Sequence, residues 1–334
     1  MSESHLTPKI AKEIKRKDIL FSMAMEYETG HLIAGSSDSN LYAYDFTEAA
    51  DTEPRPLAGH SSYVTGIALT RRWIVSGSYD GSLIWWHRES GVQERRIPAH
   101  TRWIRGVVAS PDRGIIASVA DDMVCRVWNA ETGGLIHQLQ GHPELTPQHY
   151  PSMLFVCAFS PDGRHLATAD KPGRIIVWDL ESGTAISTLE APTMYTWDPK
   201  QRRHSIGGIR SLAFSPDGTR LAAGGIGQIG NIDHLAAKAR IEIFDWRKAQ
   251  RVVEFPGDKF NGLVEHMAFH PNEHWLAVAG GDHKGFLIFL NPSDGKVIRQ
   301  DTAPMHVHEF ALNDQGDRMT AVGHHKIVEW AVEG

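Results

Sequence analysis

Phe159-Ser-Pro-Asp-Gly163 and Pro172-Gly-Arg-Ile-Ile-Val-Trp178-Asp179 are the two motifs that decide the fold of this 334-residue sequence. In the first, Pro presets φ, Asp caps the backbone locally and Gly accepts a positive φ, which predicts a tight turn. In the second, a turn signal precedes a short alternating apolar run, which is typical of a β-strand and not of a helix. Together the motifs predict strands separated by tight turns.

Both motifs recur along the chain. The turn returns as Ala109-Ser-Pro-Asp-Arg-Gly114 and Phe214-Ser-Pro-Asp-Gly218, and the strand returns as Ser78-Tyr-Asp-Gly-Ser-Leu-Ile-Trp-Trp86 and Asp121-Asp-Met-Val-Cys-Arg-Val-Trp128. Gly59-His60, Ala99-His100 and Gly141-His142 stand between the repeats. A period near 42 residues separates Trp86 from Trp128, and spacing of this kind indicates a repeat architecture.

This combination of Gly-His, Ser-Pro-Asp-Gly and Trp-Asp at such a period resembles the WD40-repeat β-propellers. The resemblance implies an all-β fold, a seven-bladed propeller, with the terminal position of each third strand filled by Tyr44, Trp86, Trp128, Trp178, Phe244, Leu290 and Trp330. One four-stranded unit cannot bury both of its faces, so the units stack radially and a single domain over 1–334 is expected in place of two. The expected blades are 19–60, 61–100, 101–142, 152–190, 208–257, 262–303 and 305–334 plus 9–16.

The N-terminal segment 9–16 is expected to close the ring as the outer strand of the last blade, since the last repeat has room for only three strands. A frayed tail is the alternative.

Ser, His and Asp recur together in a way that superficially suggests a hydrolase. Because the set repeats blade after blade, whereas an active site occurs once, we interpret it as structural. By the resemblance, each set is a polar tetrad inside one blade, linking loop, turn and Trp indole. The expected members are His60, Ser76, Asp80 and Trp86, then His100, Ser118, Asp122 and Trp128, then His142, Thr168 and Trp178, where Asp170 comes two places early.

Three insertions break the period, at 143–151, 191–208 and 226–238. All three are expected on one face over blades four and five, where loops of such scaffolds carry function. Tyr195, Trp197, Arg202 and Arg203 are residue types that anchor interfaces, so we predict a partner-binding platform there. The alternative is that the insertions only pack on one another.

The resemblance also implies a channel mouth, because the first positions of the inner strands surround the top of the channel in this family. Alignment of the inner strands puts six candidate residues at such positions: Tyr63, Trp103, Arg105, Arg210, His306 and His308. A peptide with an acidic group could use Arg105 and Arg210, with Tyr63 and Trp103 as apolar walls. The second hypothesis is a metal site or metal-dependent enzyme at the histidine-rich top of blades six and seven, with His306, His308, His324 and His325 as candidates.

Composition limits the function classes. The chain is 41% hydrophobic and 22% charged with a net charge of −6, which is ordinary for a globular protein and argues against nucleic-acid binding. With two cysteines, a polar lysine-rich start and no long apolar run, we expect a cytoplasmic protein away from membranes. The sequence therefore predicts a monomeric, non-catalytic scaffold without a cofactor that binds a protein or peptide.

Overall fold

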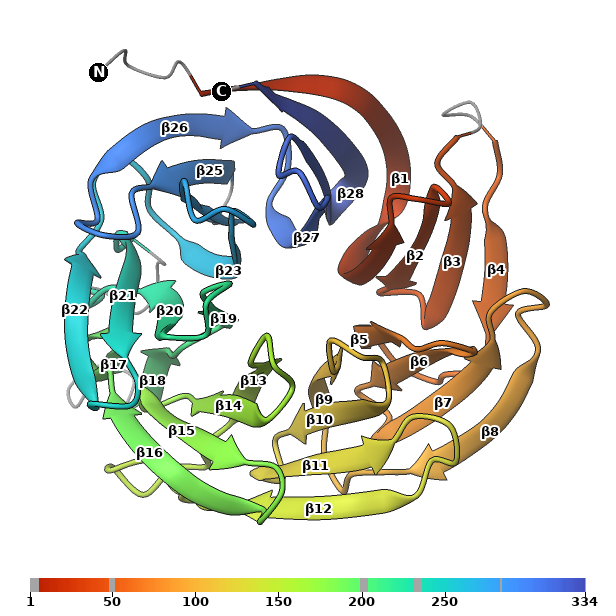
Figure 1. The fold of residues 1–334 in the computed structure, drawn as a ribbon, viewed down its shortest axis with the longest axis horizontal. Coiled ribbons are helices and arrows are strands. Elements are labelled where there is room, and N and C mark those ends of the chain that lie inside the picture. Colours follow the sequence, from red (N-terminus) through yellow and green to blue (C-terminus); the bar gives the residue numbers. More distant parts are fainter. Residues whose placement is uncertain (1–5, 48–51, 199–203, 231–235, 283, 334) are drawn as a thin grey trace.

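A computed structural model describes residues 6–47, 52–198, 204–230, 236–282 and 284–333. Strands β1 to β28 and one short 3-10 helix, η1 (Pro192–Met194), are its regular elements. The strands stand as sheets arranged radially about a central axis, so the protein is an all-β propeller (Figure 1). No helix in these ranges is long and apolar enough to cross a membrane.

Five of the sheets have four antiparallel strands each. The first two contain β5 (Val64–Leu69), β6 (Trp73–Ser78), β7 (Ser82–His87) and β8 (Gln93–Pro98), then β9 (Ile104–Ala109), β10 (Ile115–Ala120), β11 (Val124–Asn129) and β12 (Leu135–Gln140). The third contains β13 (Leu154–Phe159), β14 (His165–Asp170), β15 (Arg174–Asp179) and β16 (Thr184–Glu190). The last two contain β19 (Ser211–Phe214), β20 (Arg220–Ile226), β21 (Ala239–Asp245) and β22 (Gln250–Phe255), then β23 (Leu263–Phe269), β24 (Leu276–Gly281), β25 (Gly285–Leu290) and β26 (Val297–Ala303).

The sixth sheet joins the two ends of the chain. Its order is β27 (Val307–Leu312), β28 (Arg318–Glu333), β1 (Thr7–Glu26), β2 (His31–Ser36), β3 (Asn40–Asp45) and β4 (Arg55–Ala58). The sequence predicts seven separate blades, but the ring in the described residues has six hydrogen-bonded sheets. The reason is β1, a single strand that pairs with β28 from Thr7 to Ile19 and with β2 from Leu20 to Glu26, with register shifts in both pairings.

The inner strands form a closed series of neighbours around the axis. β5 contacts β9, and the series continues through β13, β19, β23 and β27 to β1, which contacts β5 again. Inner strands begin at one face of the ring, where Tyr63 and Trp103 stand just before β5 and β9. We call this the mouth face.

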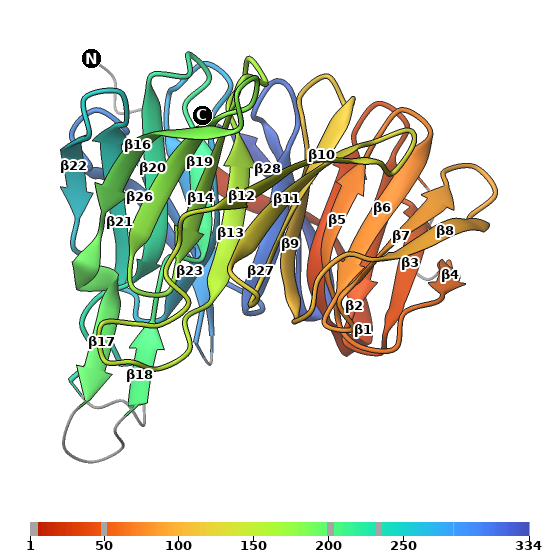
Figure 2. The ribbon, with the colours of Figure 1, turned by 90° about the horizontal axis from the view of Figure 1, so that it is seen from below.

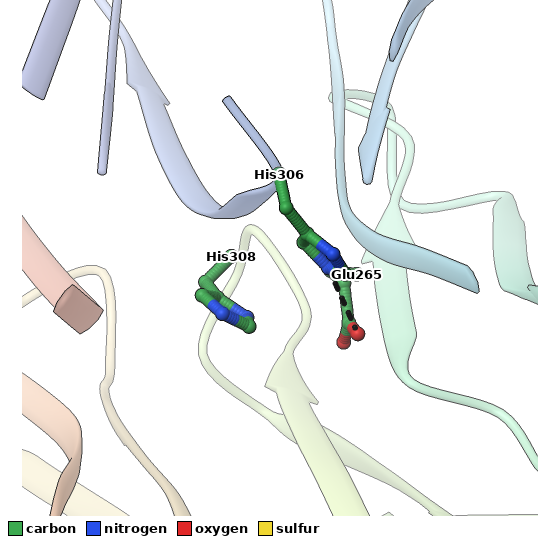
Figure 3. A group of neighbouring side chains, drawn as sticks. All are labelled: Glu265, His306 and His308. Atoms are coloured by element: carbon green, nitrogen blue, oxygen red, sulfur yellow. Dashed lines mark ion pairs between the residues drawn. The ribbon is translucent and has the colours of Figure 1, made fainter. Parts of the chain in front are cut away.

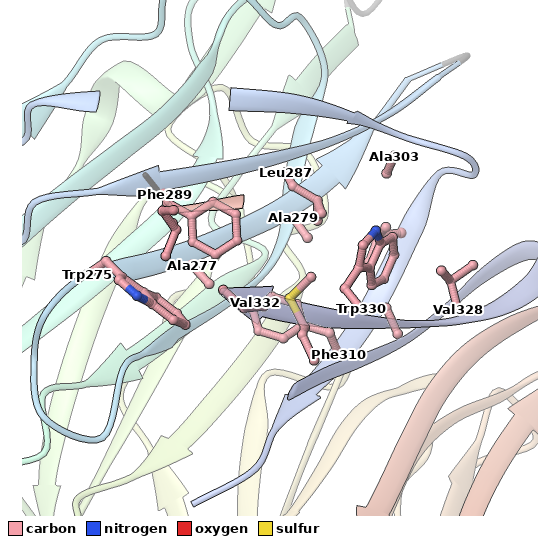
Figure 4. Packing of buried hydrophobic residues seen from close by; sticks show 14 of the residues in the cluster. Trp275, Ala277, Ala279, Leu287, Phe289, Ala303, Phe310, Val328, Trp330 and Val332 are labelled. Atoms are coloured by element: carbon pink, nitrogen blue, oxygen red, sulfur yellow. The ribbon is translucent and has the colours of Figure 1, made fainter. Parts of the chain in front are cut away.

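The hydrophobic core lies between neighbouring sheets, as expected for units that cannot bury both faces alone. In one cluster, Trp275 and Phe289 of one sheet pack with Phe310, Val328 and Trp330 of the next (Figure 4). Each of these five side chains is at most 5% exposed. Truncation of such a buried aromatic side chain to Ala costs about 3–5 kcal/mol, so the sheets hold one another in place.

The Ser-Pro-Asp-Gly motif makes the turn between first and second strands. The Ser160 hydroxyl donates to Asp162 at 2.5 Å, and Asp162 in turn accepts from the backbone N–H of Arg164. Gly163 has φ of +68°, a left-handed conformation that favours glycine. These turns lie on the face opposite the mouth face, because they follow the inner strands.

A two-stranded hairpin, β17 (Tyr195–Asp198) and β18 (His204–Gly207), projects from the ring beside the sheet of β13 to β16 (Figure 2). At the base of the hairpin, the backbone of Gly208 comes close to that of Lys171. Gly208 has φ of +103°, and a Cβ there would lie 2.8 Å from Phe155 and 3.0 Å from the Cα of Lys171. The hairpin therefore starts from the mouth face.

Candidate partner-binding site at the channel mouth

The tetrad residues come together in three blades. In the sheet of β5 to β8, His60 lies 3.0 Å from Asp80 and 2.7 Å from Ser76, and Ser76 accepts from Trp86 at 2.8 Å. The next sheet repeats this with His100, Asp122, Ser118 and Trp128. In the third, His142 contacts Thr168 and Asp170, each at 2.8 Å, and Trp178 donates to Thr168. Asp170 thus takes the place of Asp80 and Asp122 in this blade, although it stands two residues earlier in the repeat.

Each imidazole bridges a hydroxyl and a carboxylate, and the Trp indole N–H donates to the same hydroxyl oxygen. In the tautomer whose Nδ1–H donates to Asp, Nε2 is left to accept from the hydroxyl. Burial alone would raise the pKa of Asp80, but hydrogen bonds from His60 and Ser82 outweigh it and lower that pKa well below its usual value. The polar side-chain atoms of each set therefore bond to one another within the blade, as expected for a structural role.

Aromatic side chains form a row along the channel mouth. Trp103 stacks on Tyr79 with centroids 4.6 Å apart and planes 2° apart, and Tyr63 lies 5.6 Å from Tyr79 and 5.4 Å from Phe21. Trp103 is 51% exposed and Tyr63 is 44% exposed, so both rings offer apolar area to solvent. Large exposed rings held by stacking are typical anchors of protein interfaces.

Arg105 lies behind this row and is already occupied. It donates to both carboxylate oxygens of Asp121, at 2.8 and 2.7 Å, and to the Tyr79 hydroxyl. Its guanidinium also lies over the Tyr79 and Trp103 rings, at 4.9 and 5.3 Å. Arg105 therefore supports the aromatic row and is a weaker anion-binding candidate than the sequence suggests.

Arg210, in contrast to Arg105, has an Nε without a hydrogen-bond partner in the described part of the chain. Its guanidinium lies 3.6 Å from the centroid of the Phe155 ring, and its Nε is buried without a hydrogen-bond partner among the described residues. Lys171 lies nearby, and its pKa is lowered first by burial and then by the charge of Arg210. Arg210 and Phe155 face a channel cavity of about 510 Å³ that Phe21, Tyr79 and Glu265 also line. A half-buried guanidinium whose Nε–H has no partner within the described ranges could donate to an acidic group.

Histidines gather on the other side of the mouth (Figure 3). His306 lies 4.7 Å from His308 and 4.9 Å from His324, measured between ring centroids. His306 Nε2 lies 3.5 Å from Glu265 Oε1. Burial opposes ionisation of Glu265, but His306, His308 and Arg210 lower its pKa to about 2. His325 is exposed and points away, with Nδ1 3.0 Å from the carbonyl oxygen of Lys17.

The three insertions contact one another. Tyr195 donates to Gln148 at 2.6 Å, the Tyr150 ring lies 5.0 Å from Trp197, and the backbone N–H of Ile229 donates to Thr196. As a result Tyr195 and Trp197 are half-buried and less available than the sequence suggests. Arg202 and Arg203 lie outside the described residues. Sequence reasoning missed Tyr150, which is 40% exposed beside Trp197, since only the fold brings the two insertions together.

Comparison with known proteins agrees with this architecture. The family model for the WD domain, G-beta repeat, matches 52–87, 91–129, 133–179, 198–228 and 249–286, which is more than half of the chain. The chain belongs to the WD40 family. As a WD40 protein it is similar to apoptotic protease-activating factor 1 of Rattus norvegicus, with 29% identity over 58% of this chain and 14% of that protein.

Other WD40 relatives match a similar share of the chain. Guanine nucleotide-binding protein subunit beta of Solanum tuberosum is 29% identical over 59% of this chain and 51% of its own length. WD repeat-containing protein VIP3 of Arabidopsis thaliana is 29% identical over 45% of each protein. The chain thus spans about half, or much less, of the length of these relatives.

Proposed function

We propose that this WD40 protein is a non-catalytic scaffold that binds a protein or peptide at the channel mouth. The observation that carries the proposal is the exposed aromatic row of Tyr63 and Trp103 beside the unpartnered cation of Arg210. Relatives include a protein whose name describes a subunit of an assembly, the guanine nucleotide-binding protein subunit beta. The tetrads do not compete with this role, since their polar atoms are used within the blades.

The partner is a peptide segment that carries an aromatic or aliphatic side chain next to an acidic one. The apolar side chain would lie on Trp103, above a second cavity of about 530 Å³ that Arg102 and Met153 also line. The acidic group would reach Arg210 in the channel. The hairpin β17–β18, with Tyr150 and Trp197 at its side, would extend the contact over the neighbouring blades.

We also infer that the six-stranded sheet combines two blades, giving seven in all with the ranges predicted above. The inner series contains both β27 and β1, and β28 reverses within itself, since the N–H of Val332 donates to the carbonyl of Asp317. Residues 9–16 would then complete the last blade, by pairing with the second half of β28.

The experiment is affinity purification with the full chain as bait, followed by calorimetry with the purified partner. Trp103→Ala and Tyr63→Ala should each weaken binding tenfold or more while the melting temperature stays near that of the wild type, because both rings are exposed. Ile136→Ala is the matched control, since Ile136 is 46% exposed on the outer strand β12. Equal affinity of the wild type, the two mouth variants and the control would refute the proposal.

A further inference from the structure

Glu265, His306 and His308 form a cluster that the proposed scaffold role does not use. Glu265 lies on β23, His308 on β27 and His306 directly before β27, so the cluster joins two neighbouring sheets at the channel (Figure 3). One carboxylate oxygen and one imidazole nitrogen from each histidine all lie within 4.8 Å of one another. Of the groups of three or more His, Cys, Asp or Glu in the described residues, this one alone has such spacing.

The hydrogen bonding of His306 prepares it as a ligand. Its Nδ1 lies 3.0 Å from the carbonyl oxygen of Asp282, so Nδ1 carries the hydrogen and donates it. In the neutral ring Nε2 therefore holds a lone pair, and it faces the Glu265 carboxylate at 3.5 Å. Two acceptors that face each other in a half-buried place favour a cation between them, either a proton or a metal ion. A backbone carbonyl that orients the far nitrogen is the usual support of a metal-bound histidine.

His308 contributes a second unused nitrogen. Nε2 of His306 and Nε2 of His308 are both buried without a hydrogen-bond partner among the described residues. Buried polar atoms are nearly always satisfied, so two orphans beside one carboxylate point to a missing ligand. His324, whose ring lies 5.1 Å from that of His308, stands next to the cluster as a further nitrogen.

We propose that Glu265, His306 and His308 bind one divalent transition-metal ion, with Zn²⁺ as the best fit. Two imidazoles and one carboxylate suit Zn²⁺, whose bonds of about 2.0–2.2 Å leave a fourth position open. Imidazole ligands disfavour Mg²⁺ and Ca²⁺, which prefer oxygen. Arg210 lines the same channel cavity as Glu265 and His308, so its charge opposes that of a bound cation. Because the ligands come from two sheets, the ion would clamp β23 to β27.

The test is calorimetric titration of the full, untagged chain with ZnCl₂ and separately with MgCl₂. We expect one equivalent of Zn²⁺ to bind, the melting temperature to rise and Mg²⁺ not to bind. Glu265→Gln and His308→Asn should each lower the Zn²⁺ affinity tenfold or more, and melting in a chelator reports whether each variant is folded. His325→Asn is the matched control, because His325 is exposed on β28 and lies outside the cluster.

A second readout separates this site from scattered surface histidines. Co²⁺ in place of Zn²⁺ should give the visible absorption of a four-coordinate site in the wild type and in His325→Asn, and lose it in Glu265→Gln. No Zn²⁺ binding by the folded wild type, or equal affinity in all four proteins, would overturn the proposal. Partner binding by the mouth is measured separately, so failure here leaves the scaffold role standing.

Discussion

Ser118 is the residue on which the polar network of its blade depends. Its hydroxyl accepts from the Trp128 indole at 3.0 Å and lies 2.8 Å from His100 Nε2. Ser118→Ala would leave both nitrogens buried and unpaired, so we expect a loss of about 1–3 kcal/mol in the free energy of unfolding. Urea denaturation measures it. The control is Ser61→Ala at an exposed position, and an equal effect of the two substitutions would contradict the role given to Ser118.

His100 also predicts a dependence on pH. Burial lowers its pKa below 6.5, against the opposing effect of Asp122, so the folded chain keeps this imidazole neutral. The unfolded chain takes up the proton first as pH falls below about 6.5, and the stabilisation is lost progressively below that value. His100→Gln should therefore show a shallower fall in unfolding free energy between pH 7 and pH 5 than the wild type. His325→Gln is the exposed control, and a slope unchanged in His100→Gln would count against this account.

At the scale of elements, β1 carries the most specific prediction. Its residues from Thr7 to Lys15 pair with the second half of β28, and Ile14 lies opposite Ile327. Removal of residues 1–16 exposes the β28 edge and the apolar surface beneath it, so we expect the melting temperature to fall by several degrees or more. A synthetic peptide of residues 1–16, added in trans, should restore part of the loss. An unchanged melting temperature after truncation would show that this pairing contributes nothing to stability.

The strands and turns could be predicted because their signals are local. The Ser-Pro-Asp-Gly motif predicts a turn and the alternating apolar runs predict strands without reference to the rest of the chain. The propeller and its repeat could therefore be predicted from the sequence. The function of single mouth residues could not be predicted. Arg105 and Arg210 occupy aligned positions in the sequence. Arg105 donates to Asp121 and Tyr79, whereas the Nε of Arg210 has no hydrogen-bond partner among the described residues. The sequence predicts 9–16 and 19–60 in different blades, but it does not predict that β1 runs through both pairings as one strand.

On the scale of the whole molecule, chemistry is distributed unequally between the two faces. The mouth face gathers the aromatic row, Arg210 and the histidine cluster. The hairpin β17–β18 also projects from it (Figure 2). The opposite face carries the repeated turns, in which Ser215 bonds to Asp217, and ion pairs between blades, such as those of Glu26 with Arg88 and Arg113. The repeated strands form the same scaffold in every blade. Partner binding is therefore expected where loops and unpartnered polar groups interrupt the repeat.

The last prediction tests this asymmetry through charge. A chain with net charge −6 repels an acidic partner on the whole, so attraction must come from the local cations of the mouth. Arg210→Met should lower the affinity for the purified partner about tenfold, because the partner's acidic group loses a charge-assisted hydrogen bond from the guanidinium. Arg247→Met is the matched control: Arg247 is exposed on the opposite face, where it donates to the carbonyl of Gly218. An equal loss in both variants would place binding outside the mouth, whereas a selective loss in Arg210→Met, with the salt dependence of the wild type reduced, would locate the acidic group in the channel.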